Sequence, residues 1–203
     1  MTETNKKQVS VYQVTARMIN DLARNDGTTI SKAHLARLRQ SIGKPLSQTV
    51  DIWPLLFQYL PEEFLSKSGK TTLEQKAILT TLQLYALYQQ GSQNAEVKLN
   101  KQENTPNIGA SLAYLRREKD QRVASDRRFN TLITATDFTE LIYYLRQMVK
   151  LLKGKSQGQV LINYPRLAED LYWYLRGYEE NVRIRWAQSY YMNREEGVNS
   201  DEE

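Results

Sequence analysis

The strongest constraint on the fold is a run of apolar residues with helical spacing between Asp137 and Lys153. Seven apolar side chains in this segment fall within about 60° of one line when successive residues are turned by 100° on an α-helix. Asp137 and Glu140 have the spacing of a capping box, which marks a helix start. We therefore predict a helix with one buried face, formed by Phe138, Leu141, Ile142, Leu145, Met148, Val149 and Leu152.

The same period recurs elsewhere in the chain. A helix is predicted over 31–42, ended by Gly43, and another between a start signal at Thr71 and Glu74 and a stop at Gly91. Their apolar stripes are Leu35, Leu38 and Ile42, and Ile78, Leu82 and Tyr85. Glycine and proline together number only 14. An all-α fold of about nine helices is therefore expected.

Two segments near the C-terminus also favour helix. Asn163 and Gly177 are typical start and stop residues for a helix over 164–176. The string VRIRW at 182–186 alternates like a strand, but its continuation also fits a helix, and the helical context favours the helix. The polar, aromatic-free stretch 91–107 is predicted to be a long surface loop or domain linker.

Composition excludes several chemistries. The chain has no cysteine and one histidine, so disulfides, thiolate nucleophiles and metal sites built on Cys or paired His are excluded within one chain. The string SGKT at 68–71 lacks the second glycine of a phosphate-binding loop, since Phe64 stands there, and no strand precedes it. The acid pairs Asp137–Glu140 and Glu169–Asp170 are explained by capping and solvated helix faces. We expect no catalysis, no metal and no cofactor.

The charge distribution favours a polyanionic partner. The net charge is +5, and five acids lie in the last nine residues. The stretch 195–203 is predicted to be a disordered acidic tail, which leaves a body of about +10. The N-terminus has no apolar stretch for a secretory signal, and no apolar run reaches the roughly 18 residues of a membrane span. The expected compartment is the cytoplasm.

Basic residues interleaved with aromatic ones are the most informative functional signal. Arg146, Lys150 and Lys153 follow one another at i, i+4 and i+7 beside a buried face, and Trp173 lies on the polar side of its helix, where it needs a partner. A solvated face explains any one such group, but together they favour a protein that contacts the nucleic-acid backbone. The candidate contacts are Lys32, Arg37, Arg39, Arg116, Arg117, Arg122, Arg127, Arg128, Arg146, Lys150, Lys153 and Arg176.

The order of eight short strings resembles a known family. They are LARLR (35–39), WPLLFQYLPEEF (53–64), ILTTLQLYALYQQG (78–91), IGASLAYL (108–115), DRRFNTLI (126–133), LIYYLRQMVKLLK (141–153), LAEDLYWYL (167–175) and VRIRWAQSYY (182–191). The sequence is similar to the CasB family, the small subunit of the type I-E CRISPR Cascade complex. The similarity extends over about residues 30 to 191 in the right order.

The resemblance implies two small helical bundles and no catalysis. We expect an N-terminal bundle over 1–107, with a disordered start and the linker 91–107, and a C-terminal bundle over 108–194. The resemblance also implies two copies of the chain in a complex with other Cascade subunits and a CRISPR RNA. In that complex, basic side chains hold the target and displaced DNA strands of the R-loop.

The family's functional arginines correspond to a subset of the candidates. They match Arg39, Arg127, Arg128, Arg146 and Arg176. Some family members carry further arginines where this chain has Gln40, Thr134 and Gln147. Replacement charge is expected from Arg116, Arg117, Lys150 and Lys153.

Two other functions fit parts of the pattern. A stand-alone helix-turn-helix regulator would use the 31–42 helix as its reader, and it requires one compact basic helix and a specific duplex site. A helical scaffold without a nucleic-acid role would be indifferent to salt and to DNA. The charge is spread over both halves of the chain, which favours the Cascade subunit.

Overall fold

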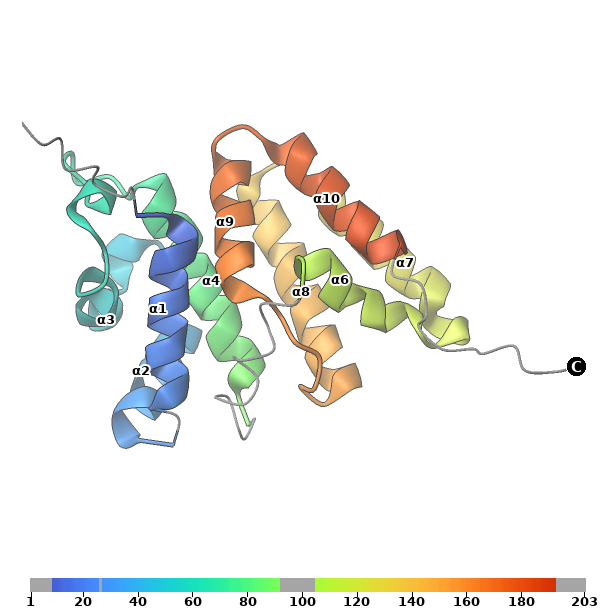
Figure 1. Cartoon of the computed structure of the whole chain (residues 1–203), viewed down its shortest axis with the longest axis horizontal. Helices are drawn as coiled ribbons and strands as arrows, with labels where there is room; N and C mark the ends of the chain where they lie inside the picture. Colours follow the sequence, from blue (N-terminus) through green and yellow to red (C-terminus); the bar gives the residue numbers. More distant parts are fainter. Residues whose placement is uncertain (1–8, 26, 92–104, 193–203) are drawn as a thin grey trace, which may run out of the picture.

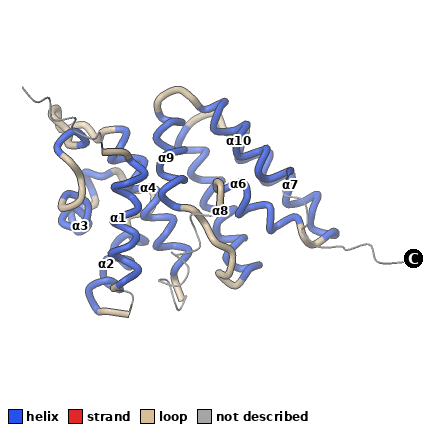
Figure 2. The backbone as a smooth tube through the Cα atoms, in the orientation of Figure 1, coloured by secondary structure: helices blue, strands red, loops and turns tan. Residues whose placement is uncertain are grey.

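A computed structural model describes residues 9–25, 27–91 and 105–192. Within these ranges the chain forms nine α-helices, four short 3-10 helices and no strand (Figure 2), which confirms the all-α prediction. The predicted disordered start, residues 92–104 of the predicted linker and the predicted acidic tail lie outside the described residues. In the described part of the chain, no helix combines the length and apolar character needed to cross a membrane.

The helices follow one another with short connections. The first half contains α1 (Val11–Arg24), α2 (Thr29–Gln40), α3 (Trp53–Phe57) and α4 (Leu73–Gln89), with 3-10 turns at Leu46–Gln48, Val50–Ile52 and Glu62–Phe64. The second half contains α6 (Ile108–Leu112), a 3-10 helix (Ala113–Arg116), α7 (Lys119–Ile133), α8 (Phe138–Ser156), α9 (Tyr164–Leu175) and α10 (Glu179–Met192). The strand-like string at 182–186 is helical, as predicted.

Helix α4 is the centre of the packing. Nearly every side chain from Gln75 to Tyr88 is buried, including the polar Thr81 and Gln83. A helix that is apolar around most of its circumference needs neighbours on several sides. Here α1, α2, α8 and α9 supply them.

Helix α9 returns to the first half of the chain and lies beside α1 and α4 (Figure 1). On its other side, α10 packs against α9 and α6, and α7 packs against α8. Trp186 of α10 and Phe129 of α7 are fully buried there. The division into two bundles at residue 107 stays a prediction.

The helix starts depend on side-chain caps, and one start was predicted wrongly. Thr72, rather than Thr71, precedes α4: its Oγ1 accepts from the Gln75 N–H at 3.2 Å, and Gln75 Oε1 accepts from the Thr72 N–H at 3.1 Å. This reciprocal pair moves the start one residue downstream of the predicted Thr71–Glu74 signal. Asp137 caps α8 and Asn163 caps α9, as predicted.

Helix α2 ends two residues earlier than the predicted 31–42. Ser41 closes it, with its hydroxyl donating to the Leu38 carbonyl at 2.7 Å. The Gln83 side-chain amide of α4 donates to the Ser41 carbonyl at 2.9 Å. This hydrogen bond joins the end of α2 to α4. Ile42 therefore lies in the turn between α2 and Gly43.

The prediction that Glu169 and Asp170 lie on a solvated face is wrong for Asp170, whose side chain is fully buried. Its carboxylate accepts from Trp186 Nε1 at 2.8 Å and from Arg185 at 3.1 Å. Arg166 Nε is 3.4 Å away, one turn before Asp170 on α9. Asp170 thus joins α9 to α10.

The close approach of α6 to α10 requires glycine at position 109. A Cβ on Gly109 would overlap the carbonyl group of Trp186. We expect Gly109→Ala to lower the free energy of unfolding by about 1 to 3 kcal/mol, because two packed helices would have to separate. Urea denaturation measures this change. Gly154→Ala on α8, where a Cβ meets no atom within 4 Å, is the control and is expected to be neutral or stabilising.

Candidate nucleic-acid interface

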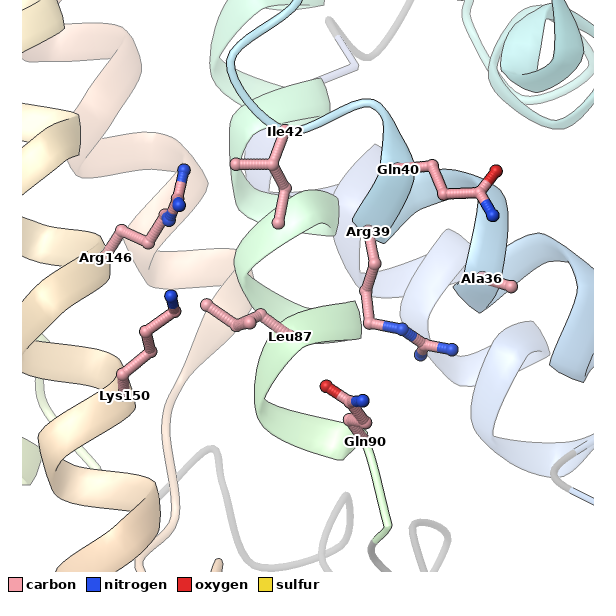
Figure 3. A pocket seen from close by; sticks show the side chains of 8 residues that line it. All are labelled: Ala36, Arg39, Gln40, Ile42, Leu87, Gln90, Arg146 and Lys150. Carbon is pink, nitrogen blue, oxygen red and sulfur yellow. The ribbon is translucent and has the colours of Figure 1, made fainter.

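The structure brings together four predicted basic residues from distant parts of the sequence. Arg39 of α2 lies across the end of α4 from Arg146 and Lys150 of α8 (Figure 3). Lys153 of α8 contacts the same end of α4 through the carbonyls of Leu87 and Gln90. Arg39, Arg146 and Lys150 line an open groove of about 400 Å³ between these three helices (Figure 3). Among the residues that the structure describes, no acidic side chain lines this groove. We refer to it below as the α2–α4–α8 groove.

The end of α4 holds two of the four cations. Arg39 Nη1 donates to the Ala86 carbonyl at 3.3 Å, and Lys153 Nζ donates to the carbonyls of Leu87 and Gln90. The last carbonyls of a helix carry partial negative charge, which stabilises nearby cations. Partial burial, and next the charge of Arg39, lower the pKa of Lys153 below its usual value. Arg39 and Lys153 therefore join α2 and α8 to α4 in addition to supplying charge.

Arg146 and Lys150 are the cations best placed to bind an anion. They lie one turn apart on α8, and both point into the groove (Figure 3). Lys150 is exposed. Arg146 Nε is buried and has no hydrogen-bond acceptor among the described residues. A buried donor without a partner is costly, so an anion that accepts from it would be bound favourably.

Uncharged side chains complete the groove. None of them is among the contacts predicted from the sequence. Ala36, Ile42 and Leu87 give it an apolar floor, and the amides of Gln40 and Gln90 lie at its edge (Figure 3). The spacing of charges carries no signal for them. Gln40 had been noted only as a departure from the family pattern.

The basic stretch before Phe129 is partly used for structure. Arg116 pairs with Asp126 at 2.9 Å and lies over the rings of Tyr190 and Tyr191 at 5.4 and 5.0 Å. The Tyr190 hydroxyl also donates to Asp126, at 3.0 Å. Asp126 raises the pKa of Tyr190, although burial is the larger cause. Arg116 thus helps to hold α10 against the middle of α7.

The remaining candidates lie outside the α2–α4–α8 groove. Arg117 is exposed over the Tyr114 ring at 4.7 Å, and Arg122 Nε donates to the Arg116 carbonyl at 3.2 Å. Arg176 lies over Trp173 at 5.4 Å, and the Tyr178 ring meets Trp173 edge-on at 5.2 Å. The partners expected for Trp173 are therefore found within the chain. The exposed cations Lys32 and Arg37 belong to α2, and Arg127 and Arg128 to α7.

Comparison with known proteins decides the family. The sequence matches the family of the CRISPR-associated protein Cse2 over residues 34–191. This chain belongs to the Cse2 family. The CRISPR-associated protein Cse2 of Thermus thermophilus is 30% identical over 178 residues, which cover 86% of this chain and 88% of that protein. The predicted CasB resemblance is therefore confirmed.

Solved structures of CasB proteins have the same fold as this chain. The crystal structure of CasB from Thermobifida fusca aligns with a TM-score of 0.68 at 20% identity, covering 89% of this chain and 97% of that one. CasB from M. ruber aligns with a TM-score of 0.67 at 26% identity, covering 91% and 94%. The range matched to the Cse2 family includes every residue that lines the α2–α4–α8 groove.

Proposed function

We propose that this Cse2-family chain is a non-catalytic small subunit of a type I-E CRISPR surveillance complex (Cascade). In that role it binds the DNA backbone without sequence preference and stabilises the R-loop. Its partners would be the other Cascade subunits, a second copy of itself, the bound CRISPR RNA and the target and displaced DNA strands. All of these are expected in the cytoplasm.

The observation that carries the proposal is the convergence of Arg39, Arg146 and Lys150 on one groove, with no acidic side chain among the described residues that line it. Phosphate contacts require positive side chains and no further geometry, and they carry no sequence information. The exposed pair Arg127 and Arg128 on α7 adds a second basic surface. A strand that follows both surfaces would be held by charge, while base pairing with the guide would supply sequence specificity.

One copy of the chain is expected to bind weakly. Contacts that depend mainly on charge give dissociation constants of about 10⁻⁴ to 10⁻⁶ M at physiological salt. In a complex already anchored by guide pairing, the same contacts become intramolecular. An effective concentration near millimolar exceeds these dissociation constants, so the weak contacts are occupied. The role is therefore expected to be exercised in the assembly.

Removing this subunit from the RNA-loaded complex is expected to weaken target-DNA binding and shorten the R-loop lifetime. The reason is that the complex loses the intramolecular phosphate contacts of every copy. Filter binding and single-molecule dwell times at physiological salt measure the two quantities, with the complex reconstituted by added subunit as the control. Equal affinity and equal R-loop lifetime with and without the subunit would contradict the proposal and favour a scaffold.

A further inference from the structure

The α2–α4–α8 groove contains more than a phosphate site needs. We propose that it holds one unpaired nucleotide, with the base against the apolar floor and the phosphate between Arg146 and Lys150. This inference rests on the proposed function and specifies the ligand of the same groove. It distinguishes a single strand with an accessible base from a duplex that presents only its backbone.

The first support is the apolar floor: Ile42 and Leu87 lie between Arg39 of α2 and the two cations of α8, and Ala36 lies on α2 on the other side of Arg39 (Figure 3). Ile42 and Leu87 are partly exposed there. A phosphate contact leaves such a surface in water, whereas the face of a base covers it. A volume of about 400 Å³ lies in the range of pockets that enclose small ligands. Bases inside a duplex are stacked and paired, so they cannot reach this floor.

The second support comes from the two amides at the edge, Gln40 and Gln90. A glutamine side chain both donates and accepts, and rotation exchanges its two ends. Every base edge carries donors, acceptors or both, so each base finds a partner. Amides of this kind bind a base and discriminate little between bases. This agrees with the proposed binding of DNA without sequence preference.

The third support is the hydrogen bonding and exposure of the cations that line the groove. Arg39 is held by the Ala86 carbonyl, which fixes one wall of the groove. On the opposite wall, Arg146 Nε is buried without an acceptor, and Lys150 is exposed one turn further along α8. A phosphate placed there pairs with the partly exposed guanidinium group of Arg146 and with the ammonium group of Lys150. The base attached to that phosphate then has the apolar floor within reach.

The test compares two probes with the same charge. One is a thymidine oligonucleotide about 12 nucleotides long, and the other is the same backbone with every base removed. With the full chain at low salt, we expect the intact strand to bind roughly tenfold more tightly than the abasic strand, as measured by fluorescence anisotropy.

Ala36→Leu fills space at the floor without changing charge or adding a ring on which a base could stack. It is expected to abolish this difference while leaving the abasic affinity unchanged. The matched control is Ala16→Leu, at a partly exposed alanine of α1 that does not line the groove. It should keep the tenfold difference. If circular dichroism shows that Ala36→Leu is unfolded, the double variant Gln40→Ala and Gln90→Ala replaces it, with the same expected loss.

The outcomes separate this inference from the proposed function. Equal affinity of the original chain for the intact and abasic strands overturns the nucleotide site and leaves backbone binding intact. A difference that survives in both Ala36→Leu and the double amide variant also overturns it, because the base is then bound elsewhere. If neither the intact nor the abasic strand binds at low salt, the proposed function is overturned together with this inference.

Discussion

Replacing Asp170 with alanine is expected to lower the free energy of unfolding by about 3 to 5 kcal/mol. The carboxylate is fully buried, and Trp186 Nε1 donates to it at 2.8 Å and Arg185 at 3.1 Å. Alanine would leave a buried indole N–H and a partly buried guanidinium without their acceptor. Guanidinium denaturation followed by circular dichroism measures the loss.

The neighbouring acid provides the control. Glu169 pairs with Arg166 at 3.0 Å, but its side chain is 28% exposed, so Glu169→Ala is expected to cost less than about 1 kcal/mol. Burial raises the pKa of Asp170 above its usual value, against the opposing effects of Trp186 and the arginines. The neutral Asp170→Asn variant should therefore cost less than Asp170→Ala. Equal losses for Glu169→Ala and Asp170→Ala would contradict a structural role for the buried carboxylate.

Helices whose signals are local were predictable from the sequence. The caps at Asp137 and Asn163 each accept from a backbone N–H three residues away, so spacing alone places the starts of α8 and α9. The predicted start of α4 is wrong by one residue because Thr71 and Thr72 each have a possible capping-box partner three residues later, Glu74 and Gln75. Only the reciprocal bonds between Thr72 and Gln75 distinguish them.

Features that depend on tertiary packing were not predictable. Asp170 follows another acid on a helix that looks polar on that side, and only the approach of α10 buries it. The packing of α9 against α1 and α4 likewise depends on residues far apart in the sequence.

In the candidate site, too, local patterns identify single residues, whereas their arrangement depends on tertiary packing. The sequence identified the three cations of α8 by their spacing and Arg39 by its place in the LARLR string. Their meeting around one groove follows from the packing of α2 and α8 on α4, which no local pattern encodes. The sequence also could not separate Arg116, which is paired with Asp126, from exposed cations such as Arg127.

Reversing both groove cations, by Arg146→Glu and Lys150→Glu, is expected to weaken DNA binding by the isolated chain about 5- to 8-fold at 0.1 M salt. Each lost phosphate contact lowers the magnitude of the log–log salt slope by about 0.7 on single strands and about 0.9 on duplex. Because Arg146 and Lys150 share one phosphate, the magnitude of the slope is expected to fall by about 0.7 to 0.9. Fluorescence anisotropy over a salt series measures the affinity and the slope together.

The matched control changes net charge equally but outside the groove. Arg17→Glu on α1 and Lys67→Glu in the loop before α4 reverse two exposed cations that do not line the groove. Long-range attraction falls in both double variants, so a difference between them reports local phosphate contacts. Neither variant should lose its helical circular-dichroism signal, because Lys150 is exposed and the Arg146 Nε has no acceptor to lose. Similar salt slopes in the two double variants would show that only overall charge attracts DNA, and the groove would then lose its role as the binding site.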